Sequence, residues 1–198
     1  MTETPDDRRA AIERAARAVF ERRGYAAATV RSISAAAGVG PSVLSSLYRN
    51  KAELFAAVID LPFDPTSAIP RLVAPGLDGM GERLVRLALR AADDENVRSD
   101  VGVLAPGVPD ILNGTPGVVR AVWEFVSGEI VDQVITRAGI PDAKMRGALI
   151  TSYLGGVLLA RYGLRVEPLA SASEDDVVAL VAPTIQSILD PTQPLPGH

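Results

Sequence analysis

The chain has 198 residues, enough for one domain or two small ones with a buried core. Hydrophobic residues make up 47% of the sequence and charged residues 22%, so we expect a globular fold and not a disordered chain. There is no cysteine, and the only histidine, His198, is the last residue. This composition excludes disulfides and thiolate chemistry and argues against zinc sites and histidine-based catalysis. We therefore expect no metal, no cofactor and no enzymatic activity.

Charge is distributed unevenly along the chain, whose net charge is −4. Residues 1–51 carry nine Lys and Arg against five Asp and Glu, a balance of +4. Residues 52–198 carry eleven against nineteen, a balance of −8. A basic N-terminal segment on an acidic body is typical of a module that binds a polyanion, although chance scatter of surface charge would give the same numbers.

No segment of the sequence predicts membrane insertion or export. The longest strongly apolar stretch, residues 148–160, has thirteen residues. A membrane span needs about 20. The N-terminal sequence MTETPDDRRAA lacks the basic-then-apolar order of a signal peptide. We expect a soluble, cytoplasmic protein.

The first part of the chain predicts four helices separated by glycine and proline. Apolar residues recur at helical spacing, and Gly24 and Gly38 stand where helices commonly end. Thr29 is placed to cap the second helix, Pro41 to start the third, and Asn50 to cap the fourth. The expected ranges are residues 8–23, 29–37, 41–49 and 50–61.

The rest of the chain predicts further helices and no strand. Residues 61–78 are rich in proline and glycine, so we expect a connector there without a helix of its own. Further helices are expected over residues 79–92, 97–105, 115–138, 142–165 and 174–189. The prediction is thus an all-α fold of about nine helices.

The short third helix has a serine-rich side that a core helix would not need. Two helices joined by a glycine turn, the second starting at a proline, fit a helix-turn-helix. Leu44 and Tyr48, four residues apart, would hold the second helix against the first. The opposite side would enter the DNA major groove, where small hydrogen-bonding groups and apolar contacts to thymine methyls discriminate bases. The residues on that side are Ser42, Val43, Ser45, Ser46 and Leu47. A helical hairpin with a solvated serine face fits the same pattern, and both interpretations stay open.

Three stretches between residues 8 and 59 follow a family pattern: a first helix ending in FERRGY, then TVRSISAAAGV, and YRNKAELF after the short helix. Together they resemble the tetracycline-repressor (TetR) family of bacterial transcription regulators. The matching positions are Thr29, Ile33, Ala37, Gly38, Val39, Lys51 and Leu54. The chain departs from the pattern at Gly40, Val43, Ser45, Leu47 and Tyr48, where the family usually has Ser, Thr, Tyr, His and Phe. These departures bear on DNA affinity and not on the fold.

The resemblance implies a DNA-binding head over residues 1–51, a connecting helix over 51–61, and a ligand-binding and dimerisation body over 62–198. Near the starts of the second and fourth helices, Thr29, Arg31 and Lys51 would contact DNA phosphates. The DNA-binding residues implied in this way are Thr29, Arg31, Pro41, Ser42, Val43, Ser45, Ser46, Tyr48 and Lys51.

Within the body, we expect residues 142–165 and 174–189 to form a homodimer interface. Small residues in the first of these segments would allow close helix packing, either with a partner subunit or within one subunit. They are Gly147, Ala148, Ser152, Gly155, Gly156 and Ala160. A pocket for a modest, largely apolar ligand is expected to be lined by Phe63, Met80, Leu84, Leu104, Trp123 and Tyr153, each of which could equally be ordinary core.

These features predict a ligand-responsive transcriptional regulator, by family default a repressor, that binds a palindromic operator as a dimer and is released by a small apolar effector. The alternative is a helix-turn-helix-derived protein-interaction module with weak or no DNA binding. An all-helical enzyme is disfavoured because the sequence has no phosphate loop and no nucleophile motif.

Overall fold

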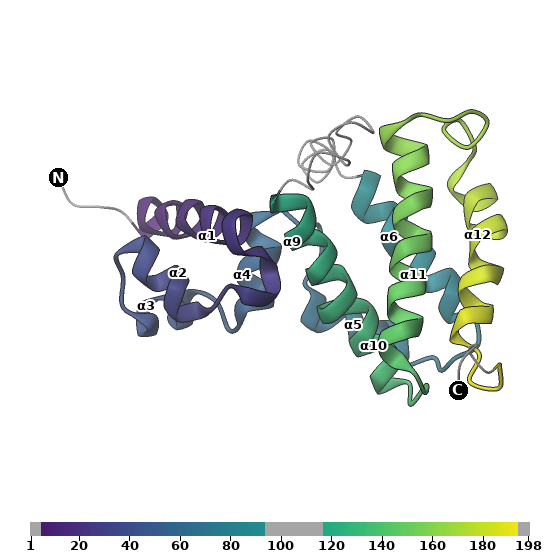
Figure 1. Ribbon diagram of the computed structural model, residues 1–198, viewed down its shortest axis with the longest axis horizontal. Helices are drawn as coiled ribbons and strands as arrows, with labels where there is room; N and C mark the ends of the chain where they lie inside the picture. The colour runs from purple at the N-terminus through teal and green to yellow at the C-terminus, as the bar shows by residue number, and fades with distance from the viewer. Residues whose placement is uncertain (1–4, 94–116, 194–198) are drawn as a thin grey trace.

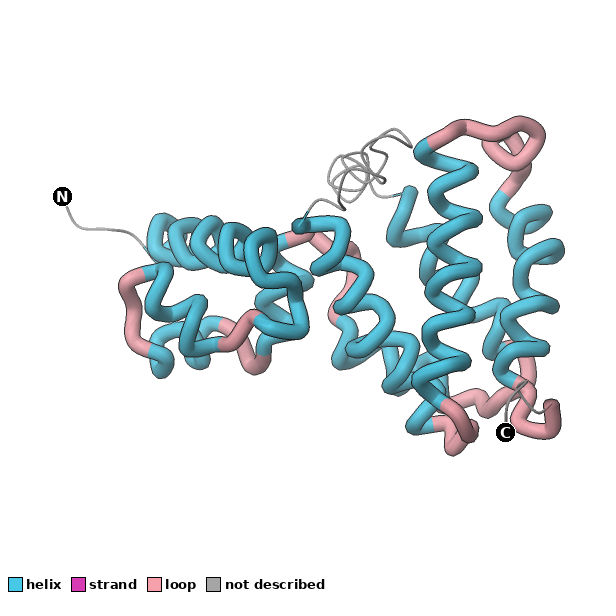
Figure 2. Tube along the Cα trace, in the orientation of Figure 1, coloured by secondary structure: helices cyan, strands magenta, loops and turns pink. Residues whose placement is uncertain are grey.

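The computed structural model describes residues 5–93 and 117–193. Both ranges are helical and neither contains a strand (Figures 1 and 2), which confirms the all-α prediction. In Figure 1 the N-terminal helices form a small head at one end, and the later helices form a larger body at the other. Within these ranges, no helix is long and apolar enough to cross a membrane.

Four helices build the head, and local side-chain signals set their boundaries. They are α1 (Pro5–Ala27), α2 (Val30–Ala37), α3 (Pro41–Leu47) and α4 (Lys51–Val58). The Thr29 hydroxyl accepts the N–H of Ser32, and the Ser32 hydroxyl accepts the N–H of Thr29, both at 3.1 Å, so the pair caps α2. Gly38 ends α2 in the left-handed conformation, with φ of 67°. Pro41 stands in the first turn of α3. These predicted boundaries are confirmed.

Two boundaries of the head differ from prediction in detail. Gly24 does break α1, with φ of 76°, but helical geometry resumes and continues to Ala27. The Asn50 side chain caps α4 by accepting the N–H of Glu53 at 2.8 Å. The Glu53 carboxylate accepts the N–H of Arg49, at 2.7 Å, where a full capping box would pair it with Asn50.

In its described residues, the body contains three long helices and five shorter helical segments. In chain order they are α5 (Pro65–Val73), α6 (Met80–Asp93), α9 (Gly117–Phe125), a π-helical segment (Val126–Val131), α10 (Asp132–Arg137), α11 (Ala143–Leu158), a second π-helical segment (Leu159–Gly163) and α12 (Glu174–Leu189). The π-helical segments join α9 to α10 and extend α11, so each of these predicted helices runs without a break. The helix predicted over residues 97–105 lies outside the described residues.

The expectation that residues 61–78 form a connector without a helix is wrong. Helix α5 lies there, because the Asp64 side chain accepts the N–H of Thr66 at 2.9 Å and Pro65 occupies the first turn. Ile69 and Leu72 are buried and anchor the helix in the body. The proline content of this stretch concealed a helix that Pro65 starts and that continues through Pro70.

An aromatic cluster joins the head to the body. Phe20, Tyr25 and Phe55 come from the head, and Phe125 comes from α9. The Phe125 ring centroid lies 4.9 Å from that of Phe55 and 5.2 Å from that of Tyr25. Helix α9 therefore completes the core of the head, and a displacement of α9 must repack it.

The body has a second core, formed mainly by α6, α10, α11 and α12. Helices α6 and α12 cross closely at Gly81, where an added Cβ would lie 2.6 Å from the carbonyl oxygen of Ala182. The Gly81 N–H donates to the Gln186 side chain at 2.8 Å, and the Gln186 amide donates to the Leu77 carbonyl at 2.9 Å. A glycine is required here for backbone-to-backbone approach.

Arg146 in α11 is 1% exposed, although it is an arginine. Its guanidinium donates to the carbonyls of Pro141 (3.1 Å), Ile188 (2.5 Å), Asp190 (3.0 Å) and Gln193 (2.7 Å). These carbonyls lie around the C-terminal end of α12, where the helix has unpaired acceptors and partial negative charge. Arg146 therefore caps α12 from inside the protein.

Candidate nucleic-acid interface

Helix α3 is held to the head by one side and exposes the other. Leu44, 1% exposed, is its only fully buried side chain. Val43 and Leu47 are half-buried and pack against the head core. The exposed residues of α3 are Pro41, Ser42, Ser45 and Ser46. The surface predicted to face DNA is thus available, and three of its four exposed side chains are hydroxyls.

The start of α2 provides a second polar surface next to α3. Thr29 and Arg31 are both exposed there. In the free protein the Thr29 hydroxyl caps α2 by accepting the N–H of Ser32. The free N–H groups of a helix start attract anions, and the Arg31 charge adds to that attraction. The geometry allows both residues the phosphate contacts predicted for them.

Lys51 has a structural role that the sequence did not reveal. Its ammonium donates to the carbonyls of Tyr25 at 2.8 Å and Ala28 at 3.2 Å, and it lies 4.1 Å from the centroid of the Tyr25 ring. Burial lowers the pKa of Lys51, and the carboxylates of Glu129 and Glu124 partly offset that shift. Two of its three N–H donors are thus engaged, and Lys51 ties the start of α4 to the last turn of α1 and to Ala28 directly after it.

The prediction that Tyr48 contacts DNA is wrong. Tyr48 is 2% exposed, and its hydroxyl donates to the carboxylate of Glu13 in α1. The chain leaves the helical conformation at Tyr48 (φ −135°, ψ 124°), and the side chain lies within the head core. The four-residue spacing from Leu44 indicated this burial, whereas the family comparison alone had grouped Tyr48 with the DNA contacts.

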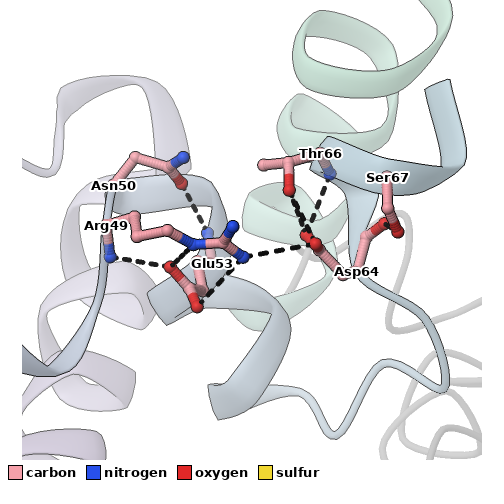
Figure 3. Close-up of polar contacts among 6 residues, drawn as sticks. All are labelled: Arg49, Asn50, Glu53, Asp64, Thr66 and Ser67. Carbon is pink, nitrogen blue, oxygen red and sulfur yellow. Dashed lines mark hydrogen bonds and ion pairs between the residues drawn. The ribbon is translucent and has the colours of Figure 1, made fainter. Parts of the chain in front are cut away.

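A polar network that the sequence analysis missed connects the end of the helix-turn-helix to α5 (Figure 3). The Arg49 guanidinium donates to Glu53 at 3.0 Å and to Asp64 at 3.3 Å. Asp64 also caps α5 through Thr66. Hydrogen bonds from Thr66 are the main cause that lowers the pKa of Asp64, and the positive charge of Arg49 lowers it further. Arg49 therefore bridges the head and the body, although its side chain is 67% exposed and each ion pair is weak.

An open groove of about 610 Å³ lies beside this network, between α1, α4 and the start of α5. Charged residues make up half of its lining, including Arg9, Glu13, Arg49 and Glu53. Phe63 is the one predicted pocket residue that lines it. The groove is polar and open, so it does not have the character of the predicted pocket for a modest, largely apolar ligand.

The other predicted pocket residues differ in burial. Met80 and Leu84 are 0% and 3% exposed and belong to the body core. Trp123 and Tyr153 are 44% and 38% exposed. Leu104 lies outside the described residues. Two of these residues thus lie in the body core and two are partly exposed, and a pocket shared by them stays a prediction.

The glycines of α11 have different surroundings. The ring of Trp123 lies against Gly155, and the carboxylate of Asp132 lies against Gly147, each too close for a Cβ. These two glycines accommodate side chains of the same subunit. Gly156 instead has nothing within 4 Å of a built Cβ.

An apolar surface remains uncovered on α11 and α12. Met145, Leu149 and Tyr153, spaced four residues apart on α11, are 56%, 42% and 38% exposed. Leu180 on α12 is 73% exposed. The two segments expected to form a dimer interface therefore both present apolar side chains to solvent in the single chain.

A direct hydrogen bond links α9 to the head near the point where α1 ends. The Ala26 N–H donates to the Glu124 carboxylate at 2.8 Å. The same carboxylate lies against Gly24, where an added Cβ would be 2.7 Å from its oxygen. Together with Phe125, Glu124 couples the body to the segment that carries α2 and α3.

Comparison with known proteins agrees with this architecture. The model of the family described as "Bacterial regulatory proteins, tetR family" matches residues 12–58, and that described as "Tetracyclin repressor-like, C-terminal domain" matches residues 78–189. A TetR-family regulator from Streptomyces coelicolor A3 is 30% identical, with 96% of this chain and 99% of that chain covered and a TM-score of 0.46.

Native NalD of Pseudomonas aeruginosa, the secondary repressor of the MexAB-OprM multidrug efflux pump, is 16% identical. The match covers 92% of this chain and 96% of NalD, with a TM-score of 0.43. No curated protein matches the chain. The family matches cover the helix-turn-helix and more than half of the chain: this protein belongs to the TetR family of bacterial regulators and is a DNA-binding transcriptional regulator, not an enzyme.

Proposed function

We propose that the protein is a repressor that binds a palindromic operator as a homodimer and releases it when a small, largely apolar effector binds the body. The observation that carries the proposal is the exposed face of α3, with Ser42, Ser45 and Ser46 directed away from the Leu44 anchor. Hydroxyls both donate and accept hydrogen bonds, as base edges in the major groove require. Thr29 and Arg31 would hold the adjacent phosphates. Such a protein would act on chromosomal DNA in the cytoplasm.

The dimer would form through α11 and α12, residues 142–165 and 174–189. The uncovered apolar side chains of Met145, Leu149 and Leu180 support this, as does the open space beside Gly156. A twofold interface would present two copies of α3 on one side of the assembly. Adjacent major grooves on one face of a duplex are about 34–36 Å apart, and the two copies would have to match that spacing.

Release would follow from the contacts between body and head. An effector that displaces α9 disturbs Phe125 in the head core and the bond from Ala26 to Glu124. A change in the angle of α4 would likewise break the Arg49–Asp64 pair. Both changes alter the separation of the two α3 helices, so a ligand that favours the altered state lowers operator affinity.

The experiment is selection of DNA by the purified protein from sheared genomic fragments, followed by gel-shift titration of the recovered site with and without a metabolite library. We expect enrichment of a palindromic site and weaker binding with at least one compound. A base-substitution scan with Ser42→Ala and Ser46→Ala should show altered base preference.

The alternative is a protein-interaction module that has lost DNA binding. Ser45 and Leu47 favour it, because they stand where the family usually places Tyr and His. The same selection separates the two: a partner module enriches no DNA fragment, and its affinity for duplex is weak and independent of sequence.

A further inference from the structure

Helix α3 depends on tertiary contacts for its position. It has seven residues, and a helix of this length does not form alone in water. Leu44 is its one fully buried anchor. Val43 and Leu47 are half-buried beside it, but apolar contacts are not directional, so these contacts alone still allow the helix to rotate slightly about its own axis. Such a rotation would displace the serine face, whose hydrogen bonds to bases tolerate only a few tenths of an ångström.

Tyr48 provides a second and directional anchor at the end of α3. Its backbone N–H closes the helix by donating to the Leu44 carbonyl at 3.0 Å. Its side chain is buried, and the hydroxyl donates to the Glu13 carboxylate. The two residues are 35 positions apart in sequence, so this bond connects α3 directly to α1.

Arg9 completes the arrangement from the outside. Its guanidinium donates to the same Glu13 carboxylate at 3.2 Å and lies 5.2 Å from the centroid of the Tyr48 ring. The ring is thus held at its face by a cation and at its edge by a carboxylate. Burial, together with Glu13, raises the pKa of Tyr48 to about 12, so the hydroxyl remains a donor at neutral pH.

We propose that Arg9, Glu13 and Tyr48 form a clip that sets the orientation of α3 and thereby the base preference of the protein, without touching DNA. The effect of the clip on base preference rests on the proposed operator binding, whereas its effect on the orientation of α3 does not depend on DNA. Tyr48 and Glu13 are positioning residues, since they act through the serine face. Arg9 orients the carboxylate and is the less important member, because its side chain is 53% exposed.

The test uses Tyr48→Phe, which removes one hydroxyl and retains the buried ring. Tyr25→Phe is the matched control: it removes a buried hydroxyl from the same head core, and that hydroxyl interacts with Glu129 in the π-helical segment, not with a residue of α3. In the free protein, we expect hydrogen exchange in α3 to be about tenfold faster with Tyr48→Phe, while α1 and α2 are unchanged, which corresponds to loss of about one hydrogen bond. Unchanged exchange in α3 overturns the clip, whatever the protein binds.

The second measurement compares affinity for a duplex selected by the wild-type protein with affinity for an unrelated duplex of equal length. With Tyr48→Phe, we expect the selected duplex to bind about tenfold more weakly and the unrelated duplex to bind within about twofold of wild type, because phosphate contacts do not depend on the α3 angle. Equal loss on both duplexes would show a merely structural role and overturn the proposal.

Glu13 provides the coupling test. Glu13→Leu should reproduce the loss of preference, and the double variant Glu13→Leu with Tyr48→Phe should lose no more than either single variant, since one bond connects them. Additive losses would contradict the clip. If the wild-type protein selects no duplex, the DNA-binding function fails, and the role of the clip in base preference fails with it. The exchange measurement still reports whether the clip orders α3, so the two failures are distinguishable.

Discussion

Replacing Lys51 by Met distinguishes a structural tether from a phosphate ligand. Methionine retains the apolar stem and removes the charge and the N–H donors. The ammonium makes two hydrogen bonds to carbonyls, at 2.8 and 3.2 Å, and lies over the Tyr25 ring. A hydrogen bond to a charged group contributes about 1.5–3 kcal/mol, and the cation–π contact adds about 0.5–1 kcal/mol. The desolvation cost of the charge offsets part of this sum.

We therefore expect Lys51→Met to lower the free energy of unfolding by about 2 kcal/mol. Urea denaturation followed by circular dichroism measures this change, with an unchanged m-value. The slope of DNA affinity against salt should stay as in wild type, because the ammonium is already engaged within the head.

Arg31→Met is the control, because Arg31 is exposed at the start of α2. Its stability should be unchanged, while the salt slope should fall by about 0.9, the value of one phosphate contact. If Lys51→Met left stability intact and lowered the salt slope by that amount, the tether would be refuted and Lys51 would be a phosphate ligand.

Four further changes have definite expected outcomes. Arg146→Met leaves four carbonyls near the end of α12 without their donor and should cost about 3–5 kcal/mol of unfolding free energy, measured by urea denaturation. Gly155→Val places a side chain against the Trp123 ring and should lower the melting temperature and shift tryptophan fluorescence to the red. Leu180→Glu should yield a monomer in light scattering with an unchanged circular dichroism spectrum. The pKa of Tyr48 is raised from 10.0 to about 12, so between these pH values the native state retains a proton that the unfolded state loses. The free energy of unfolding should therefore fall by about 1.4 kcal/mol for each unit that the pH rises across that window. Tyr48→Phe should remove this part of the pH dependence when denaturation is measured at a series of alkaline pH values.

The helix boundaries in the head could be predicted because their causes are local. The capping side chain of Thr29, the left-handed Gly38 and the first-turn Pro41 each act within a few residues of the chain. Helix α5 has an equally local start signal, the Asp64 cap followed by Pro65, but the proline and glycine content of residues 61–78 indicated a loop. The burial of Ile69 and Leu72 by distant helices, which shows that the segment belongs to the body, is not visible in the sequence.

The site was only partly predictable. The exposed serine face of α3 follows from the spacing of Leu44 and Tyr48, which is a local pattern. The partners of Tyr48 and Lys51 lie on other elements, 35 positions away for Glu13 and 26 for Tyr25. No periodicity in the sequence connects such positions. For the same reason, the sequence showed that the predicted pocket residues are apolar and lie on helices, but it could not show that the Trp123 ring lies against Gly155.

Methylation interference on the recovered operator tests the central claim most directly, since it identifies the major-groove guanines that the protein must reach. The account predicts two symmetric clusters of interfering guanines, with centres one helical turn of about 10–10.5 base pairs apart or a multiple of it. Both clusters should disappear when Ser42, Ser45 and Ser46 are replaced by Ala. Interference limited to one cluster, or a pattern that the serine replacements leave intact, would contradict the account.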